Sequence, residues 1–371
     1  VKSAVKNCIQ ENVFYIIATL LTTMMSFSTL LKVAIVALFI QIPTWLDQRD
    51  TKVLLKYPKP PVPEYGRVTT IQHSKATMEK VASFYDQFSV DDYASSYDMY
   101  YEAQTENCNS EKNLVVVSGT NGATYLYWDL IDHFRKQGYC TLNYDYRSHG
   151  RSSAAPGIFT AELLGEDSAA MIKRVFPGKQ VHLVGLSLGG AVSYYISLNY
   201  PEMVKSVTLQ GMTSCFGKVT ADGSCDLGFD ALKWFFSTGP MLKILGTELQ
   251  HTAAVAAIKA HDTEETKNYW RYLSVATMTK TPLTWGLWNK EYYHNRIKNI
   301  KVPVLLLAGE HEHLIGFDDN SMSEDVKRIG KLAEYQIFKG FSHFMWWERF
   351  NGKSGLELSM SAMDTFYAKH F

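Results

Sequence analysis

From about residue 65 onward, hydrophobic and polar positions follow two patterns in turn. Short apolar runs predict buried strands, and segments with apolar side chains every three or four residues predict helices. The expected strands are 68–72, 97–103, 114–118, 140–145, 181–185, 204–210, 302–308 and 335–338. The expected helices are 125–137, 161–175, 188–198 and 354–368. This alternation indicates an α/β fold, in which a mostly parallel sheet carries helices on both faces.

The alternation breaks between residues 211 and 300. This stretch has a helical pattern and is rich in aromatic side chains. We expect it to form a helical cap, inserted over the carboxyl edge of a core made of residues 65–210 and 301–371. Most of the aromatic side chains should pack inside the cap, and a minority should line an apolar pocket.

The N-terminal region contains 20 consecutive uncharged residues, 12–31. A helix of this length spans about 30 Å, the thickness of the hydrocarbon layer of a bilayer. We therefore expect residues 1–46 to be a membrane anchor and the proline-rich residues 47–64 to be an extended linker. A cleaved signal peptide, a hairpin within one leaflet and an apolar helix packed on the following domain are the alternatives.

Basic residues are more frequent after this apolar stretch than before it. They are Arg49, Lys52, Lys56 and Lys59 after it, against Lys2 and Lys6 before it. By the positive-inside rule, a single-pass anchor would then leave the large C-terminal part in the cytosol.

The composition is that of an ordinary globular enzyme, with 46% hydrophobic, 20% charged and 13% aromatic residues. The net charge is 37 − 37 = 0, and no basic run is present, so we expect no nucleic-acid partner. Five cysteines in 371 residues do not make a disulfide scaffold. Cys8, Cys108 and Cys140 have no metal-binding spacing, while Cys215 and Cys225 are close enough to pair in an oxidising compartment.

The strand at 181–185 leads directly into a Gly-x-Ser-x-Gly motif centred on Ser187, and a helix is expected to follow. A nucleophilic serine must project from a tight strand-to-helix turn, and the two glycines of this turn, Gly185 and Gly189, prevent clashes between the strand and the helix. The N-terminus of the helix directs its free N–H groups and its positive dipole end towards the serine. Ser187 is therefore the candidate nucleophile.

A serine hydroxyl needs a base, and the base needs an acid that orients it. For this type of turn the expected order along the chain is serine, acid, histidine. The strand at 302–308 runs into Gly309-Glu310-His311-Glu312-His313. His343 follows the last expected strand, at the sheet edge where α/β enzymes hold their active sites.

With these motifs in order, residues 65–371 resemble the α/β-hydrolase superfamily, in the capped branch of esterases and monoacylglycerol-type lipases. Ser118-Gly119-Thr120-Asn121-Gly122 stands where the family usually has His-Gly-x-x-Gly, and residues 145–152 resemble its Asp-x-Arg-Gly-x-Gly-x-Ser turn. The resemblance makes Ser187 the nucleophile, Glu312 the acid and His343 the base. This chain departs from the family pattern at Ser118, which replaces histidine, at Ser148, which replaces glycine, and at Glu312, which replaces the more frequent aspartate.

The identity of the acid is the open point of this assignment. Glu310, Asp318 and Asp319 lie near Glu312 in the sequence and are alternatives to it. The resemblance further implies an oxyanion hole made of the backbone N–H groups of Thr120 and Leu188.

We expect neither a cofactor nor a metal. His311 and His313 could share a face with Glu312, but no further cluster of metal ligands supports a metal site.

The resemblance implies a serine hydrolase acting on carboxylic esters through an acyl-enzyme. An anchor and an apolar cap would suit a lipid-like substrate, such as a monoacylglycerol or a lysolipid, ahead of a small xenobiotic ester. An acyltransferase or a thioesterase would use the same three residues. A receptor or scaffold that binds an apolar ligand under the cap, without turnover, is the alternative from another functional class.

Overall fold

The computed structural model describes residues 60–226 and 290–371, apart from residues 87, 121, 154, 159, 216 and 313–317. The expected anchor 1–46, most of the linker 47–64 and the central part of the expected cap lie outside the described residues. Within the described ranges, no helix combines the length and the apolar character needed to cross a membrane.

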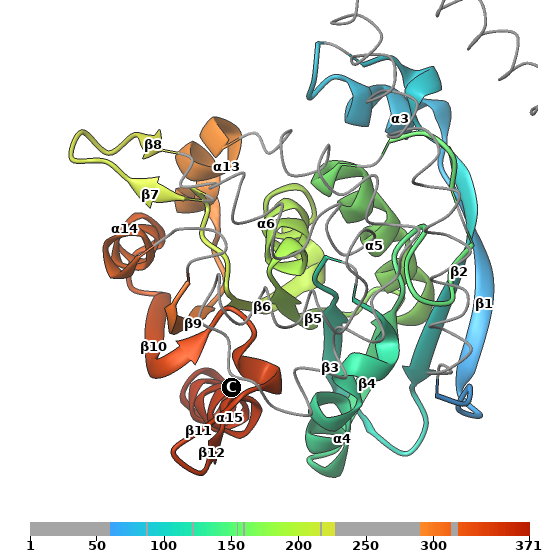
Figure 1. Cartoon of the computed structure of the whole chain (residues 1–371). Helices are drawn as coiled ribbons and strands as arrows, with labels where there is room; N and C mark the ends of the chain where they lie inside the picture. The colour runs from blue at the N-terminus through green and yellow to red at the C-terminus, as the bar shows by residue number, and fades with distance from the viewer. Residues whose placement is uncertain are drawn as a thin grey trace, which may run out of the picture. The chain divides into compact units, whose positions relative to one another are not determined.

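An eight-stranded sheet forms the centre of the described structure (Figure 1). Its strands are β1 (Gly66–Gln72), β2 (Ser96–Gln104), β3 (Asn109–Val117), β4 (Tyr139–Tyr144), β5 (Val181–Leu186), β6 (Val204–Gln210), β9 (Val304–His311) and β10 (Ala333–Ser342). They lie in the order β1-β2-β4-β3-β5-β6-β9-β10. The pairs β1–β2 and β2–β4 are antiparallel and all the others are parallel, so the expected mostly parallel sheet is confirmed.

The described helices are α3 (Lys75–Ala82), α4 (Trp128–Lys136), α5 (Ala161–Val175), α6 (Leu188–Asn199), α13 (Lys290–Arg296), α14 (Asp319–Ile329) and α15 (Gly355–His370). Short 3-10 turns are η1 (Val90–Asp92), η2 (Thr124–Tyr127), η3 (Pro201–Met203), η4 (Ile297–Asn299) and η5 (Met345–Trp347).

Helices cover both faces of the sheet (Figure 1). Helices α4 and α15 contact each other on one face, where Tyr367 of α15 reaches Thr208 of β6. Helices α5 and α6 contact each other on the opposite face, where Leu209 of β6 lies close to Gly190 of α6. The central strands β4 and β5 are buried along their whole length, including the polar residues Thr141, Asn143 and His182.

Helix α5 shows why several of the predicted bounds are correct. The hydroxyl of Thr160 caps its N-terminus by accepting a hydrogen bond from the Leu163 N–H, and the last turn holds Lys173 and Arg174. A side-chain cap at the start and basic residues at the end stabilise a helix at both termini. The helix spans Ala161–Val175, as the sequence pattern predicts.

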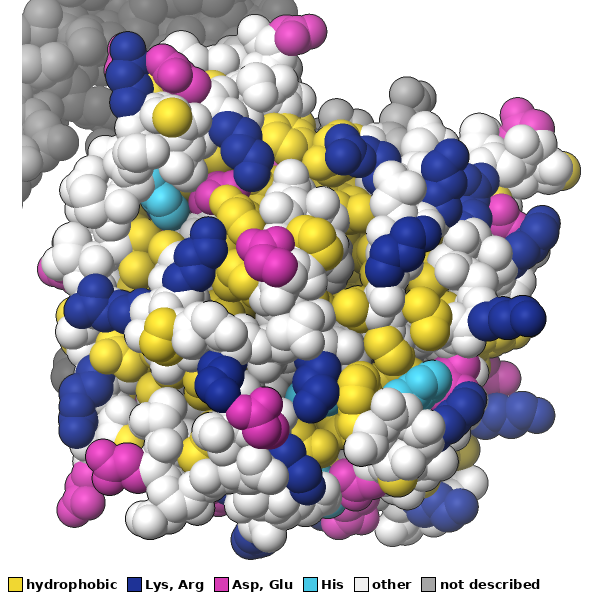
Figure 2. Space-filling model, turned by 180° about the vertical axis from the view of Figure 1, so that it is seen from behind, with side chains coloured by type: hydrophobic (Ala, Val, Ile, Leu, Met, Phe, Trp, Pro, Cys, Tyr) yellow, Lys and Arg dark blue, Asp and Glu magenta, His cyan; other side chains and the backbone are white. Residues whose placement is uncertain are grey.

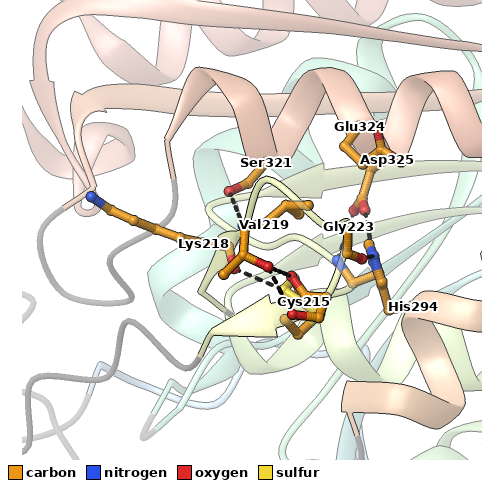
Figure 3. The surroundings of a disulfide bond; sticks show 12 residues. Cys215, Lys218, Val219, Gly223, His294, Ser321, Glu324 and Asp325 are labelled. Atoms are coloured by element: carbon orange, nitrogen blue, oxygen red, sulfur yellow. Dashed lines mark hydrogen bonds and ion pairs between the residues drawn. A yellow bond between two sulfur atoms is a disulfide. The ribbon is translucent and has the colours of Figure 1, made fainter.

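The described ends of the 211–300 insertion are partly different from the helical pattern expected for it. Residues 211–226 contain a short hairpin made of β7 (Lys218–Val219) and β8 (Cys225–Asp226), closed by a disulfide between Cys215 and Cys225 (Figure 3). Helix α13 and the turn η4 lead back from the insertion to β9.

A second disulfide joins Cys108 and Cys140, whose Cα atoms are 5.2 Å apart at the start of the neighbouring strands β3 and β4. All four described cysteines are therefore paired. A further small pair of strands, β11 (Arg349–Phe350) and β12 (Lys353–Ser354), precedes α15.

On the face of the molecule shown in Figure 2, Lys and Arg side chains are interspersed with acidic and apolar ones. They do not gather into a single basic patch on this face.

Candidate active site

Ser187 occupies a sharp turn between the end of β5 and the start of α6. Its backbone has φ 50° and ψ −115°, a left-handed conformation that is costly for a residue with a side chain. A Cβ atom on Gly185 would overlap the carbonyl of Gly189, and a Cβ atom on Gly189 would overlap the carbonyl of Val117. A side chain at either position would therefore collide with the backbone, and glycine lets the strand and the helix come this close together.

The loop that follows β3 packs directly against this turn. A Cβ atom on Gly119 would lie 3.2 Å from the side chain of Leu186, and a Cβ atom on Gly189 would meet the Ser118 carbonyl at 2.7 Å. Thr120 thus lies in a loop that contacts the Ser187 turn, and Leu188 is the first residue of α6. The N–H groups of a helix's first turn have no partner within the helix.

Tyr127 supports the loop after β3. The phenolic oxygen of Tyr127 accepts hydrogen bonds from the Gly119 N–H at 3.0 Å and from the Ser118 hydroxyl at 3.2 Å. Burial raises the pKa of Tyr127 to about 12. This tyrosine has no signal in the sequence motifs, yet its two bonds hold the loop at Ser118 and Gly119.

His343 and Glu312 form a short, buried hydrogen bond. The imidazole Nδ1 lies 2.6 Å from the Glu312 carboxylate oxygen Oε2, and both residues are less than 5% exposed. A bond of this length to a carboxylate is charge-assisted and fixes the ring's orientation, with Nδ1 donating to Glu312.

Gly211 brings this pair next to the Ser187 turn. The Ser187 N–H donates to the Gln210 carbonyl at 2.8 Å, so the Ser187 backbone is bonded to the residue preceding Gly211. A Cβ atom on Gly211 would lie 2.8 Å from His343 Nδ1 and 3.3 Å from Glu312 Oε1. Within the described residues, no hydrogen bond joins Ser187 to His343; catalytic bonds of this kind are often long in the unliganded enzyme.

The other carboxylates near Glu312 have different partners. The Glu310 carboxylate accepts a hydrogen bond from the Gly340 N–H at 2.9 Å. The Asp318 carboxylate caps α14, where it accepts hydrogen bonds from the Ser321 N–H and hydroxyl. Asp319 is exposed in the first turn of the same helix. Of these four acids, Glu312 is the one bonded to His343.

The turn at residues 145–152 is hydrogen-bonded to the loop after β3 and to helix α5. The Asp145 carboxylate accepts hydrogen bonds from the Thr124 N–H at 2.7 Å and from the Arg151 N–H at 2.6 Å. Burial raises the pKa of Asp145 to about 7. Arg147 makes two hydrogen bonds, of 2.8 and 2.7 Å, to the buried Asp167 carboxylate of α5. The turn therefore has a structural role, fastening the loops after β3 and β4 to α5.

The described residues contain no group of three or more histidine, cysteine or acidic side chains able to hold a metal ion. Residue 313, one of the two histidines considered with Glu312, lies outside the described residues.

A family model described as alpha/beta hydrolase fold matches residues 112–350 of the chain. A proline iminopeptidase of Lacticaseibacillus rhamnosus is 28% identical over 118 residues, which cover 31% of this chain and 40% of that protein. The bifunctional esterase/perhydrolase DCH of Acinetobacter calcoaceticus is 25% identical over 241 residues, covering 59% of this chain and 80% of that protein. The chain thus spans less than half of the iminopeptidase's length.

The fold is also that of a solved bacterial membrane phospholipase A. The two structures superpose with a TM-score of 0.57 at 16% identity, covering 92% of this chain and 96% of the other. At this level of identity the likeness shows a shared fold.

Proposed function

The chain belongs to the alpha/beta hydrolase fold family, and we therefore propose that it is a serine hydrolase of carboxylic esters. In this proposal Ser187 is the nucleophile, His343 the general base and Glu312 the acid that orients it. The observation that carries the proposal is the short His343–Glu312 bond next to the strained Ser187 turn. Gly211 lies against both side chains of this bond, and the preceding residue, Gln210, accepts a hydrogen bond from the Ser187 N–H.

The reaction begins when His343 Nε2 takes the proton of the Ser187 hydroxyl as its oxygen attacks the ester carbonyl. Glu312 stabilises the imidazolium that forms. His343 then gives the proton to the leaving alcohol, so that a Ser187 acyl ester remains. Water attacks this ester by the same route, which releases the acid and restores the serine.

The tetrahedral intermediates carry a negative charge on the former carbonyl oxygen. In the proposal, the backbone N–H groups of Leu188 and Thr120 donate to this oxyanion. Backbone donors make the Thr120 side chain nearly irrelevant to this role, and losing one such donor typically costs about 3 kcal/mol of transition-state stabilisation.

A lipid-like ester, of the monoacylglycerol or lysolipid type, is the substrate class that we propose. The uncharged residues 12–31 support it, because a membrane anchor would bring the enzyme to a membrane-dissolved substrate. The relatives named esterase and phospholipase point in the same direction. The relative named proline iminopeptidase makes an amide substrate the competing class that an assay must include.

A fluorophosphonate probe, which reacts with activated serines, tests the proposal on the detergent-solubilised full chain. We expect the parent to be labelled, and Ser187→Ala and His343→Ala to lose labelling and at least about 1,000-fold of ester turnover. Turnover is compared between monoacylglycerol, lysophospholipid and short-chain esters and a proline p-nitroanilide. A folded parent that binds lipid but is neither labelled nor active would favour a receptor, and product formed only with an added acyl acceptor would favour an acyltransferase.

A matched pair of variants tests the acid. Glu312→Gln places an amide N–H opposite His343 Nδ1, which favours the wrong tautomer, so we expect turnover to fall about 1,000- to 10,000-fold. Glu310→Gln makes the same chemical change two residues away, where the carbonyl can still accept from the Gly340 N–H. We expect its turnover to stay within about threefold of the parent. The opposite ranking of these variants would move the acid to Glu310.

A further inference from the structure

Glu348 follows the candidate base, His343, by five residues in the sequence. It is 1% exposed and follows the 3-10 turn η5. Its carboxylate accepts a hydrogen bond from the Ser342 N–H at 2.8 Å and another from the Ser342 hydroxyl at 2.5 Å. Both oxygens of a buried carboxylate are thus bonded to the residue immediately before His343.

The residue after His343 joins the same arrangement. The Ser342 hydroxyl oxygen accepts a hydrogen bond from the Phe344 N–H at 3.1 Å. The residues on both sides of His343 are therefore joined by hydrogen bonds, Phe344 to Ser342 and Ser342 to Glu348.

Glu348 is itself held in place. Its N–H donates to the Met345 carbonyl at 3.1 Å, and its carbonyl accepts from the Gly355 N–H at 3.0 Å. A Cβ atom on Gly355 would overlap the Met345 carbonyl, so the backbone is tightly packed where α15 begins. The Glu348 backbone is thus fixed by η5 and by the start of α15, while its carboxylate is bonded to Ser342.

We propose that Glu348 is a positioning residue for His343, which acts by holding Ser342 so that the imidazole stays on Glu312 and faces Ser187. This inference rests on the proposed hydrolase function and adds a residue to it. The bond from Nδ1 to Glu312 depends on the orientation of the ring, so a rotation of the loop would lengthen that bond and displace Nε2. Misplacement of a catalytic group by about 1 Å can cost about 100-fold in rate.

A carboxylate is the group that this site requires. Ser342 presents two donors, an N–H and an O–H, and an ionised carboxylate accepts from both. A glutamine offers one acceptor and one NH₂ group. It would keep the bond from the Ser342 N–H, but its NH₂ group cannot accept from the Ser342 hydroxyl, whose proton would lose the acceptor that it has in Glu348.

Steady-state hydrolysis of p-nitrophenyl butyrate by the full chain tests the proposal, with thermal unfolding measured for each variant. We expect Glu348→Gln to lower kcat about 10- to 100-fold while KM stays within threefold, because the ester-binding surface is unchanged. Ser342→Ala should lower kcat in the same range. In the double variant, glutamine should add less than threefold to the effect of Ser342→Ala, because both changes act through the same hydroxyl.

Glu162→Gln is the matched control. Glu162 is another fully buried carboxylate that accepts two hydrogen bonds, from the hydroxyls of Tyr85 at 2.9 Å and Tyr293 at 2.8 Å. It lies in α5, away from His343. We expect this variant to change the unfolding temperature without changing kcat by more than twofold.

The outcomes separate this inference from the proposed function. If the folded parent shows neither ester turnover nor fluorophosphonate labelling, the proposed function fails. If the parent is active and both Glu348→Gln and Ser342→Ala keep kcat within twofold, the positioning role is wrong. A fall in kcat that only matches the unfolded fraction, or that Glu162→Gln reproduces, would also overturn it.

Discussion

Gly211 leaves room for the imidazole of the candidate base because it lacks a side chain. Its φ is +65°, and a Cβ atom there would lie 2.8 Å from both Cε1 and Nδ1 of His343. We predict that Gly211→Ala displaces the imidazole and lowers ester turnover about 100-fold or more. The left-handed backbone adds a stability cost of about 1–2 kcal/mol. Esterase kinetics and chemical unfolding of the purified variant measure the two effects separately.

Gly178→Ala is the control for this prediction. Gly178 has a similar φ of +69°, but a Cβ atom there would meet nothing within 4 Å. We expect a similar loss of stability with unchanged turnover. Equal activity of the two alanine variants would show that contact with His343 does not explain the need for glycine at position 211.

At the scale of single residues, sequence motifs indicate candidate catalytic groups more readily than the residues packed around them. Ser187 and His343 follow strands at recognisable spacings, and Gly185 and Gly189 flank the serine in the same motif, so the sequence alone identifies them as candidates. Tyr127 and Glu348 have no motif, because their roles come from bonds to backbone N–H groups that the folded chain brings near. A single sequence gives no indication of such bonds.

At the scale of elements, a hydrogen-bond network joins Ser214 and His294, near the two ends of the 211–300 insertion, to Asp325 of α14 (Figure 3). Asp325 accepts hydrogen bonds from the Ser214 N–H at 2.7 Å and from the Tyr194 hydroxyl at 2.9 Å. The Ser214 hydroxyl lies 2.5 Å from Asp325 Oδ1 and 2.8 Å from His294 Nδ1. The other ring nitrogen of His294 lies 3.3 Å from the Gly223 carbonyl, so it must carry a proton to bond there.

Counting hydrogens leaves two protonation states that suit this network. Ser214 has one hydroxyl proton and lies between Asp325 and His294. Both contacts are hydrogen bonds if Ser214 donates to an ionised Asp325 and accepts from a protonated His294, or if a protonated Asp325 donates to Ser214 and Ser214 donates to a neutral His294. Burial raises the pKa of Asp325 to about 6, and burial together with the Arg328 charge lowers the pKa of His294. The hydrogen bond to the Gly223 carbonyl and the Glu324 charge act in the opposite direction on His294, but its pKa is lowered on balance, so the shifts of both groups favour the neutral pair.

Asp325→Asn should reproduce the protonated state at every pH. The amide NH₂ can donate to Ser214 while its oxygen accepts from the Ser214 N–H and Tyr194. In the parent, the stability contributed by a protonated Asp325 is fully present below about pH 4 and is lost as pH rises through about 6. We therefore predict that the variant matches the parent near pH 4.5 and is more stable by about 1–2 kcal/mol at pH 7.5.

Chemical unfolding at a series of pH values measures this difference. Asp132→Asn is the control, because it removes the same charge from a half-exposed side chain on α4. We expect its effect on the free energy of unfolding to be small and constant over the same range. An Asp325→Asn variant that is less stable than the parent at pH 7.5 would contradict the neutral-pair arrangement.

Some helices and strands could be predicted from the sequence, and others could not. Helix α5 and strand β6 match their expected bounds, since a long periodic pattern or a buried apolar run marks each. The β7–β8 hairpin has two residues in each strand, too few for any period, and it is held by a disulfide and by contacts with α14. Helix α14, unexpected from the sequence, begins at the Asp318 cap within a mostly polar segment.

At the scale of the whole molecule, the cysteines and the positive charges favour different compartments for the C-terminal part. The excess of basic residues after residue 46 favours a cytosolic location for the C-terminal part. The two disulfides favour an oxidising compartment, because cytosolic thiols are normally kept reduced. The spacing of 32 residues between Cys108 and Cys140 carries no signal in the sequence, since parallel neighbouring strands bring them together.

We predict that residues 60–371 face an oxidising compartment and carry both disulfides there. In intact cells that express the full chain, free thiols are blocked with N-ethylmaleimide before lysis. The remaining cysteines are then reduced, given a second label and identified by mass spectrometry. Cys108, Cys140, Cys215 and Cys225 should take the second label only. Because five cysteines are an odd number, at least one thiol stays outside any intrachain pair, and Cys8 should take the first label.

The stability of the reduced chain gives an independent measurement of the same prediction. Closing a loop of 32 residues removes unfolded-state entropy worth about 3–4 kcal/mol. Cys108→Ala/Cys140→Ala should lower the free energy of unfolding by about that amount in non-reducing buffer, and by less than about 1 kcal/mol in reducing buffer. If these two cysteines take the first label in cells that hold active enzyme, the cytosolic orientation favoured by the flanking charges stands and the pairing is absent in the cell.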